Sequence, residues 1–200
     1  MTPGTLPNIA LIGRMGAGKT SIAEELMGLY GYTKFSWATP VKTIGALAYG
    51  TIAKDVPYEV AVKGHPEIRT GRELLQRIGT DAMREQVDEN FWIRVGVRHL
   101  ENNPGPFVND DTRFPNEADA LARREWIIVS VSLPEKERLQ RLHLIYGDTL
   151  TADLLNHPSE QHVDKIKANY RLWNTASPRQ VAETLMHTLA QHGVAQVPQR

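Results

Sequence analysis

Short apolar runs recur along the chain, and stretches with helical periodicity separate them. Five runs are apolar or rich in β-branched and aromatic residues, namely Asn8–Ile12, Tyr32–Trp37, Pro106–Asp110, Trp126–Leu133 and Asn169–Trp173. Helical patterns cover Ser21–Tyr30, Thr39–Tyr49, Arg69–Glu85, Glu89–Asn102, Pro134–Tyr146 and Pro178–His192. Strands that alternate with helices form parallel sheets with helices on both faces. The pattern therefore predicts a three-layer α/β/α fold with a five-stranded parallel sheet.

The interval between the second and third runs is long and holds three of the helical patterns. No repeat or linker divides the chain, so we expect one domain over residues 1–200 with a helical insert at about 38–104. Ligands of open α/β sheets bind beyond the carboxyl ends of the strands. The ends of the second and third runs, Trp37 and Asp110–Asp111, should therefore lie on the functional edge of the sheet.

The segment Gly13–Thr20 follows the first apolar run and matches the phosphate-binding P-loop pattern. Backbone N–H groups of such a turn converge on a phosphate, and the next helix adds the positive end of its dipole. Lys19 is expected to reach the outer phosphates of a nucleotide, and the Thr20 hydroxyl to bind Mg²⁺. The alternative is an ordinary glycine-rich turn, but the strand before it and the helix after it favour a P-loop. Nucleotide contacts are predicted for Gly13, Arg14, Met15, Gly16, Ala17, Gly18, Lys19, Thr20 and Ser21.

Composition narrows the class of protein. Hydrophobic residues make up 41% of the chain, and 23 basic side chains balance 23 acidic ones. This is typical of a globular protein, and the lack of a basic surplus counts against a nucleic-acid partner. The absence of cysteine excludes disulfides, thiolate zinc sites and cysteine nucleophiles. No apolar run approaches the roughly 20 residues that span a bilayer, so we expect a cytoplasmic protein with no membrane contact.

Gly71–Asp81 is predicted to form one helix with two faces. Leu74, Leu75 and Ile78 share the face toward the core. Arg72 and Gln76 are four residues apart and share another side, where Arg suits a phosphate and Gln suits the edge of a base. A surface helix whose polar side faces water explains the same spacing, and the spacing does not decide between the two.

Asn109–Glu117 follows the third strand run. A carboxylate at this position is the usual second support for Mg²⁺, which makes Asp110 and Asp111 candidates. Arg113 is placed to neutralise a phosphoryl group during transfer. The alternative is that the two aspartates cap the following helix. The pattern leaves open which aspartate takes which role.

Other polar residues and tryptophans are weaker candidates. Arg138 and Arg141 lie three residues apart on the helix after Pro134 and could form a mobile basic clamp over the phosphates. Arg123 and Arg124 on the preceding helix are rival candidates for this clamp, and the alternative for either pair is a charged surface in water. Among the tryptophans, Trp126 is predicted to lie in the core, whereas Trp37 and Trp92 are candidates for a ligand cleft. The segment 157–160, with the sequence HPSE, is too short to interpret.

Together these segments resemble the deoxynucleoside monophosphate kinases of bacteriophages, a branch of the P-loop nucleoside monophosphate kinases. The resemblance rests on Gly13–Thr20, on Phe35–Lys42, on Gly71–Asp81 with Arg84, on Asp111–Glu117, and on HPSE at 157–160. It covers the chain from residue 9 to about 175, and its specific parts are the GRELLQ and DTRFPNEA strings.

The resemblance implies transfer of the γ-phosphoryl group of ATP to the 5′-phosphate of a deoxynucleoside monophosphate. Mg²⁺ would be held near Thr20 and Asp110, Asn174 would lie near the adenine, and a lid would span about 138–165. Charge-neutralising or catalytic roles are implied for Lys19, Asp111, Arg113, Arg138 and Arg141. Contacts to the acceptor nucleotide are implied for Trp37, Lys42, Arg72, Gln76, Asp111, Arg113 and Glu117.

Some questions stay open at this level. Thr39 stands where the family often has an aspartate before the proline, so the preferred base and sugar are undecided. The oligomeric state is also undecided, with a homodimer as one option, and a phage-encoded protein would act in the host cytoplasm. The rival functions are a kinase for a modified base in phage DNA, a nucleotide-driven motor or switch, and a kinase for ribonucleotides.

Overall fold

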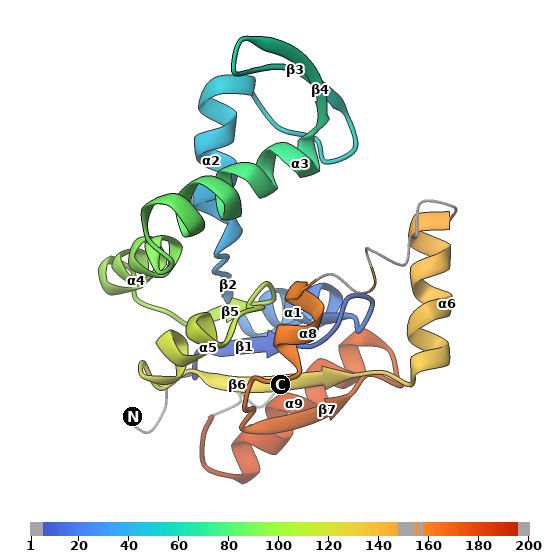
Figure 1. Cartoon of the computed structure of the whole chain (residues 1–200). Coiled ribbons are helices and arrows are strands. Elements are labelled where there is room, and N and C mark those ends of the chain that lie inside the picture. The colour runs from blue at the N-terminus through green and yellow to red at the C-terminus, as the bar shows by residue number, and fades with distance from the viewer. Residues whose placement is uncertain (1–5, 148–154, 156–157, 196–200) are drawn as a thin grey trace. The chain divides into compact units, whose positions relative to one another are not determined.

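The computed structural model describes residues 6–147, 155 and 158–195, and the chain forms two compact units (Figure 1). One unit combines Met1–Ser36 with Asn103–Arg200, and we call it the P-loop unit. The other is Trp37–Asn102, which we call the insert unit.

The P-loop unit is built on a parallel sheet in the order β2-β5-β1-β6-β7. The strands are β1 (Ile9–Ile12), β2 (Thr33–Lys34), β5 (Phe107–Asn109), β6 (Ile127–Ser132) and β7 (Tyr170–Trp173). Strand β1 is central, since Ile9 lies beside Val108 of β5 on one side and Ile127 of β6 on the other. Every residue of β1 is buried, as expected for a parallel strand covered on both faces. The predicted five-stranded parallel sheet is confirmed.

Helices cover both faces of this sheet. Helices α1 (Lys19–Tyr30) and α9 (Pro178–Gln191) pack together on one face, and α5 (Pro115–Ala122) packs against β6. Two further helices, α6 (Glu135–Tyr146) and α8 (Pro158–Val163), lie between β6 and β7 in the chain. The main core joins the sheet to α1 and α9 through fully buried aliphatic side chains, which include Leu11, Ile22, Leu26, Val108, Val129, Leu185 and Leu189. A second group, Phe35, Phe107 and Trp126, packs ring against ring, which confirms Trp126 as a core residue.

The insert unit contains a β-hairpin that the sequence analysis did not predict. Its elements are α2 (Ala38–Tyr49), β3 (Pro57–Val62), β4 (His65–Thr70), α3 (Gly71–Gln76), η1 (Arg77–Val87) and α4 (Phe91–Asn102). Strands β3 and β4 pair antiparallel. Lys63 and Gly64 between them both have positive φ, of 52° and 83°, as a two-residue type I′ hairpin turn requires. The insert therefore combines helices with a two-stranded antiparallel sheet.

The helix predicted for Arg69–Glu85 begins later and changes form midway. Its start is fixed at Gly71 because the Thr70 hydroxyl and the Glu73 carboxylate form a reciprocal capping box. From Arg77 the turns widen into the π-helical segment η1. There the Gly79 carbonyl accepts a hydrogen bond of 2.6 Å from the Trp92 indole N–H. Trp92 is buried and bonds to Gly79 of the same unit, so it packs in the interior of the insert unit.

No helix in the described part of the chain combines the length and apolar character that a membrane crossing requires.

Candidate functional site

The P-loop turn between β1 and α1 depends on its glycines. Gly13, Gly16 and Gly18 have φ of 144°, 82° and 88°, a region that residues with a Cβ rarely adopt. A Cβ on Gly13 would collide with the Val131 carbonyl oxygen, and one on Gly18 would collide with the Asn174 amide. The glycines therefore let the loop pass close to β6 and to the end of β7.

Lys19 is buried at the base of this loop, with 8% of its surface exposed. Its ammonium group donates to the carbonyl oxygens of Gly13 at 2.6 Å and Arg14 at 3.1 Å. Burial and the positive charge of Arg113 lower the pKa of Lys19 to about 8, although the carboxylates of Glu160 and Asp110 oppose that shift. An entering phosphate would remove this charge imbalance, so the side chain is prepared for an anion.

The two aspartates after β5 both face partners in the P-loop unit. Asp110 is buried and accepts a hydrogen bond of 2.9 Å from the ammonium group of Lys34. Asp111 accepts from the Ser36 hydroxyl at 2.5 Å and from the Asn109 amide at 2.6 Å. Neither caps α5, so the capping alternative is wrong for both. The carboxylates instead lie at the strand end that was predicted for them.

Glu117 provides the capping that the aspartates do not. Its carboxylate accepts from the backbone N–H groups of Arg113 at 2.9 Å and Phe114 at 3.2 Å, and its side chain is buried. Glu117 thus shapes the turn that carries Arg113.

Arg138, Arg141 and Asn174 contact or approach the P-loop from α6 and the end of β7. Arg138 is buried, is held by Glu135 at 2.7 Å, and donates to the Met15 carbonyl at 2.9 Å. The Asn174 amide donates to the Ala17 carbonyl at 2.7 Å, and Arg141 lies beside the backbone carbonyl of Asn174 at 3.5 Å. The competing Arg124 lies just after α5 and donates a hydrogen bond to the Ala120 carbonyl of that helix. The structure therefore brings the predicted pair, Arg138 and Arg141, to the loop.

Glu160 on α8 is a site residue that the sequence analysis left without a role. Its side chain is buried, and its carboxylate accepts from the Met15 backbone N–H at 2.7 Å and from Arg113 at 2.5 Å. The only sequence signal for it is its place as the last residue of HPSE. Of that segment, His157 lies outside the described residues.

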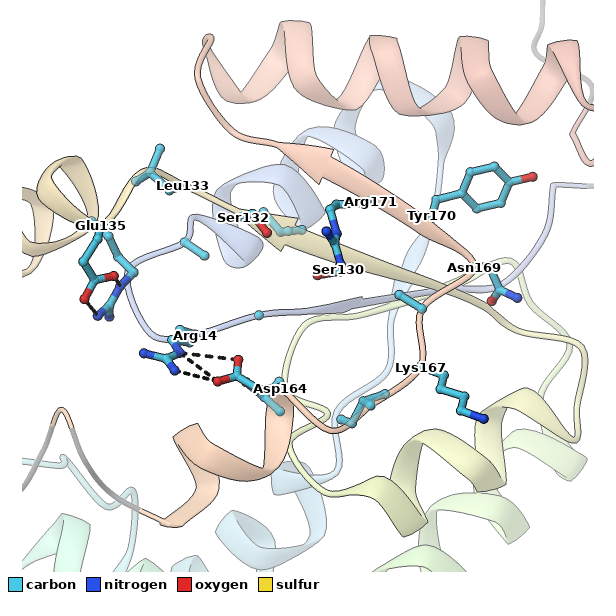
Figure 2. Close-up of a pocket in the computed structure, with 17 residues that line it drawn as sticks. Arg14, Ser130, Ser132, Leu133, Glu135, Asp164, Lys167, Asn169, Tyr170 and Arg171 are labelled. Atoms are coloured by element: carbon cyan, nitrogen blue, oxygen red, sulfur yellow. Dashed lines mark hydrogen bonds and ion pairs between the residues drawn. The ribbon is translucent and has the colours of Figure 1, made fainter.

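A cavity of about 750 Å³ adjoins the P-loop on the side of β6, β7 and residues 163–171 (Figure 2). Figure 2 shows Arg171 of β7 beside Ser130 of β6, and the two residues are neighbours in the sheet. Arg14 pairs with Asp164 across the opening at 2.6 Å. The lining carries more basic than acidic side chains, with Arg14, Arg138, Lys167 and Arg171 against Glu135 and Asp164. It suits a ligand that bears negative charge.

The insert unit carries the remaining candidates. Arg72 and Gln76 lie one turn apart on α3, as predicted, and Arg72 contacts Asp55 at 3.3 Å. Lys42 on α2 and Gln76 are exposed, whereas Trp37 is buried at the start of α2. Of these four side chains, those of Lys42 and Gln76 are the most exposed to solvent, and that of Trp37 is the least exposed.

The predicted metal-binding residues suit a cation that binds mainly to phosphate. The Thr20 side chain is exposed in the first turn of α1, and Asp110 supplies a carboxylate after β5. Within the described ranges, no group of three or more acidic, His or Cys side chains could hold a metal by itself. A divalent cation here would therefore need oxygen ligands from a bound nucleotide.

Comparisons with known proteins agree with this fold. No protein-family model matches the chain. A protein of Acanthamoeba polyphaga mimivirus named "Putative deoxynucleotide monophosphate kinase" is 27% identical over 176 residues, which cover 80% of this chain and 83% of the viral protein.

Solved structures with a similar fold are also kinases by name. Shikimate kinase from Acinetobacter baumannii in complex with shikimate gives a TM-score of 0.58 at 20% identity, covering 94% of this chain and 95% of that chain. A gluconokinase from Sinorhizobium meliloti 1021 gives 0.54 at 16% identity, covering 96% and 94%. The chain therefore has a P-loop α/β fold of the shikimate kinase type, which confirms the predicted fold class.

Proposed function

We propose that this protein is an ATP-dependent kinase that phosphorylates a deoxynucleoside monophosphate to the diphosphate. The observation that carries the proposal is the buried ammonium group of Lys19 at the base of a P-loop, with Arg113 and Arg138 close by. The name of the mimivirus relative supports a nucleotide as the acceptor. Positive charge concentrated at a P-loop is the arrangement that phosphoryl transfer needs, since that reaction depends mainly on positioning and charge neutralisation.

Each P-loop unit residue has a distinct part in this proposal. The backbone N–H groups of the loop hold the phosphates of ATP, and Lys19 moves from its carbonyl partners to the outer phosphates. Arg113 neutralises charge on the transferred group. Arg138 holds the P-loop, Arg141 holds the end of β7, and both add positive charge near the phosphates. Asn174 holds the Ala17 carbonyl of the loop and lies near the adenine of ATP.

Contacts to the acceptor nucleotide are assigned to residues of the insert unit. In this assignment Arg72 and Lys42 hold the acceptor phosphate, and Gln76 and Trp37 contact its base or sugar. Arg72 has a guanidinium that can grip phosphate in two places, and its partner Asp55 is exposed enough to release it.

The metal is assigned to Thr20 and Asp110. Mg²⁺ supplies charge neutralisation for the β- and γ-phosphates when it is bound with ATP. Asp110 is held in place by Lys34, and Asp111 by Ser36 and Asn109, so the two carboxylates differ in their neighbours. We assign Asp110 to the metal and Asp111 to the acceptor side.

The test is a screen of the four common deoxynucleoside monophosphates and their ribose counterparts with ATP and Mg²⁺. We expect diphosphate from at least one deoxynucleotide and none from the Lys19→Ala variant. No diphosphate from any acceptor, together with labelling of duplex DNA that carries 5-hydroxymethyl pyrimidines, would replace the proposal with a DNA-base kinase. Nucleotide hydrolysis without any acceptor product would point to a motor or switch.

A further inference from the structure

The environment of Glu160 is unusual for an acidic side chain in a site built for phosphate. The carboxylate is buried, with 6% of the residue exposed, and lies among groups that the proposed function assigns to anions. One oxygen accepts from the Met15 N–H at 2.7 Å and the other from Arg113 at 2.5 Å. Its charge also acts on Lys19 and on Arg14.

This arrangement makes Glu160 a bridge between segments distant in sequence. Each oxygen has a different partner, so one rigid carboxylate sets the separation between the P-loop backbone and the Arg113 guanidinium. Both hydrogen bonds are short and involve a charged acceptor, which places them among the stronger contacts in proteins. The third segment in the bridge is α8, because Glu160 is one of its residues.

The Arg113 guanidinium needs a fixed partner such as Glu160 to be oriented toward a phosphate. Its side chain is 41% exposed, whereas that of Glu160 is 7% exposed, so the carboxylate is the fixed member of the pair. A guanidinium offers five N–H donors in a plane, which allows it to hold a carboxylate on one edge and a phosphate on another. Fixing one edge therefore orients the rest.

We propose that Glu160 is a positioning residue for phosphoryl transfer, whose carboxylate holds the Arg113 guanidinium beside Met15 of the P-loop. The inference rests on the proposed kinase function and assigns the last residue of HPSE a role in that site. Glu160 does not touch the transferred group, and it acts through Arg113.

The first experiment is a double-mutant cycle on kcat with E160Q and R113M, using the deoxynucleotide that the wild type accepts. Glutamine keeps the shape of Glu160 and removes its charge. We expect E160Q to lower kcat by about 10- to 100-fold and to raise KM for ATP by only several-fold, as for other residues that orient a site group. In the R113M background, E160Q should change kcat by less than about twofold, because its target is gone. Effects that multiply would overturn the proposal.

The second experiment measures binding of inorganic tripolyphosphate by calorimetry, so that it does not depend on turnover. We expect E160Q to bind this anion several-fold more weakly than the wild type, because Arg113 is no longer aimed. The matched control is Glu24→Gln, the same change at an exposed glutamate of α1, which should stay within about twofold. Tighter binding by E160Q would show that the carboxylate competes with phosphate, and would overturn the proposal.

Folding and function are checked separately. Thermal unfolding identifies a variant that fails to fold, and E160D then replaces E160Q, since it keeps the charge and should recover part of kcat. Failure of both variants to fold would overturn the proposal in favour of a purely structural bridge. Wild-type protein that binds tripolyphosphate but phosphorylates no nucleotide would refute the proposed function instead.

Discussion

The two units differ in where they keep their polar side chains. In the P-loop unit, buried polar residues are organised around the loop, and they include Lys19, Asn109, Asp110, Thr112, Glu117, Arg138, Glu160 and Asn174. In the described structure, none of the buried polar side chains belongs to the insert unit. A phosphate site made of buried, hydrogen-bonded groups is set before the ligand arrives, which lowers the cost of ordering it. The insert unit instead presents exposed polar side chains, such as those of Lys42 and Gln76.

Asn109 at the end of β5 shows how fully the buried polar groups of the P-loop unit are hydrogen-bonded. The Asn109 side chain accepts from both the backbone N–H and the hydroxyl of Thr112, and donates to Phe35 and Asp111. Its amide therefore has a partner for each of its atoms, as a buried polar group requires. By contrast, Arg72 in the insert unit has an exposed ion pair, which is worth little in water. The comparison predicts rigid binding of the donor and adaptable binding of the acceptor.

The largest expected effect is on the donor half. Lys19→Ala should lower kcat by about a thousandfold, because the outer phosphates lose their main charge partner. The measurement is diphosphate formation at saturating ATP. Lys136→Ala, which removes an exposed ammonium group of α6 in the same unit, is the charge control and should retain much more activity. Near-normal turnover by the Lys19 variant would show that the P-loop does not bind the phosphates of ATP.

The second prediction concerns how the buried ammonium group of Lys19 makes the free energy of unfolding depend on pH. The pKa of Lys19 is about 8 in the folded protein and 10.5 ordinarily. Between these values the unfolded state binds more protons, so the free energy of unfolding of the wild type should rise with pH. Relative to Lys19→Met, which does not titrate, this gain should reach about 3 kcal/mol by pH 10.5.

The measurement for Lys19 is chemical denaturation of both proteins from pH 7 to pH 10.5. Below pH 8 the difference between them should be constant, since both states of the wild type are then protonated. A difference that stays flat across the whole range would show that burial does not perturb Lys19.

The third prediction addresses the acceptor half. Arg72→Ala should lower kcat/KM for the deoxynucleotide by about a hundredfold and change the Kd for ATP by less than about threefold. Arg77→Ala, an exposed arginine in the first turn of η1, is the matched control and should have little effect. Equal losses for donor and acceptor in folded Arg72→Ala protein would contradict the division of labour between the units.

The smallest expected effect concerns the internal order of the insert unit. Trp92→Phe removes the indole N–H that bonds to Gly79 and should lower stability by about 1 to 2 kcal/mol. Hydrogen exchange should increase in η1, while α1 and α9 keep their protection. Unchanged exchange in η1 would mean that this bond does not hold the segment.

Regular patterns made most of the P-loop unit predictable. The β1 run is apolar throughout and precedes the P-loop glycine pattern, and β5 and β6 lie in further short apolar runs. Strand β2 is only the exposed pair Thr33–Lys34 within its predicted run. The hairpin was missed although Tyr58, Val60 and Val62 alternate with exposed positions, because the apolar face is weak and charged residues interrupt it. The Lys63–Gly64 turn was its clearest signal.

Site residues were predictable only where a motif fixes their chemistry. Lys19 and Thr20 follow from the P-loop, and Arg113 follows from its place after a strand. Glu160 could not be found this way, since its partners Met15 and Arg113 are far from it in sequence and only folding brings them together. The hydrogen bond from Trp92 to Gly79 of η1 likewise joins two elements that only folding brings together.

The central place of β1 has a consequence for synthesis. Its two neighbours, β5 and β6, come from beyond the insert unit, so Trp37–Asn102 leaves the ribosome before β1 has any strand beside it. Strand β1 therefore stays apolar and unpaired while the insert unit is synthesised. Contacts between residues so far apart in the sequence form slowly. The order of translation thus makes the nucleotide site, although encoded first, among the last parts of the molecule to be completed.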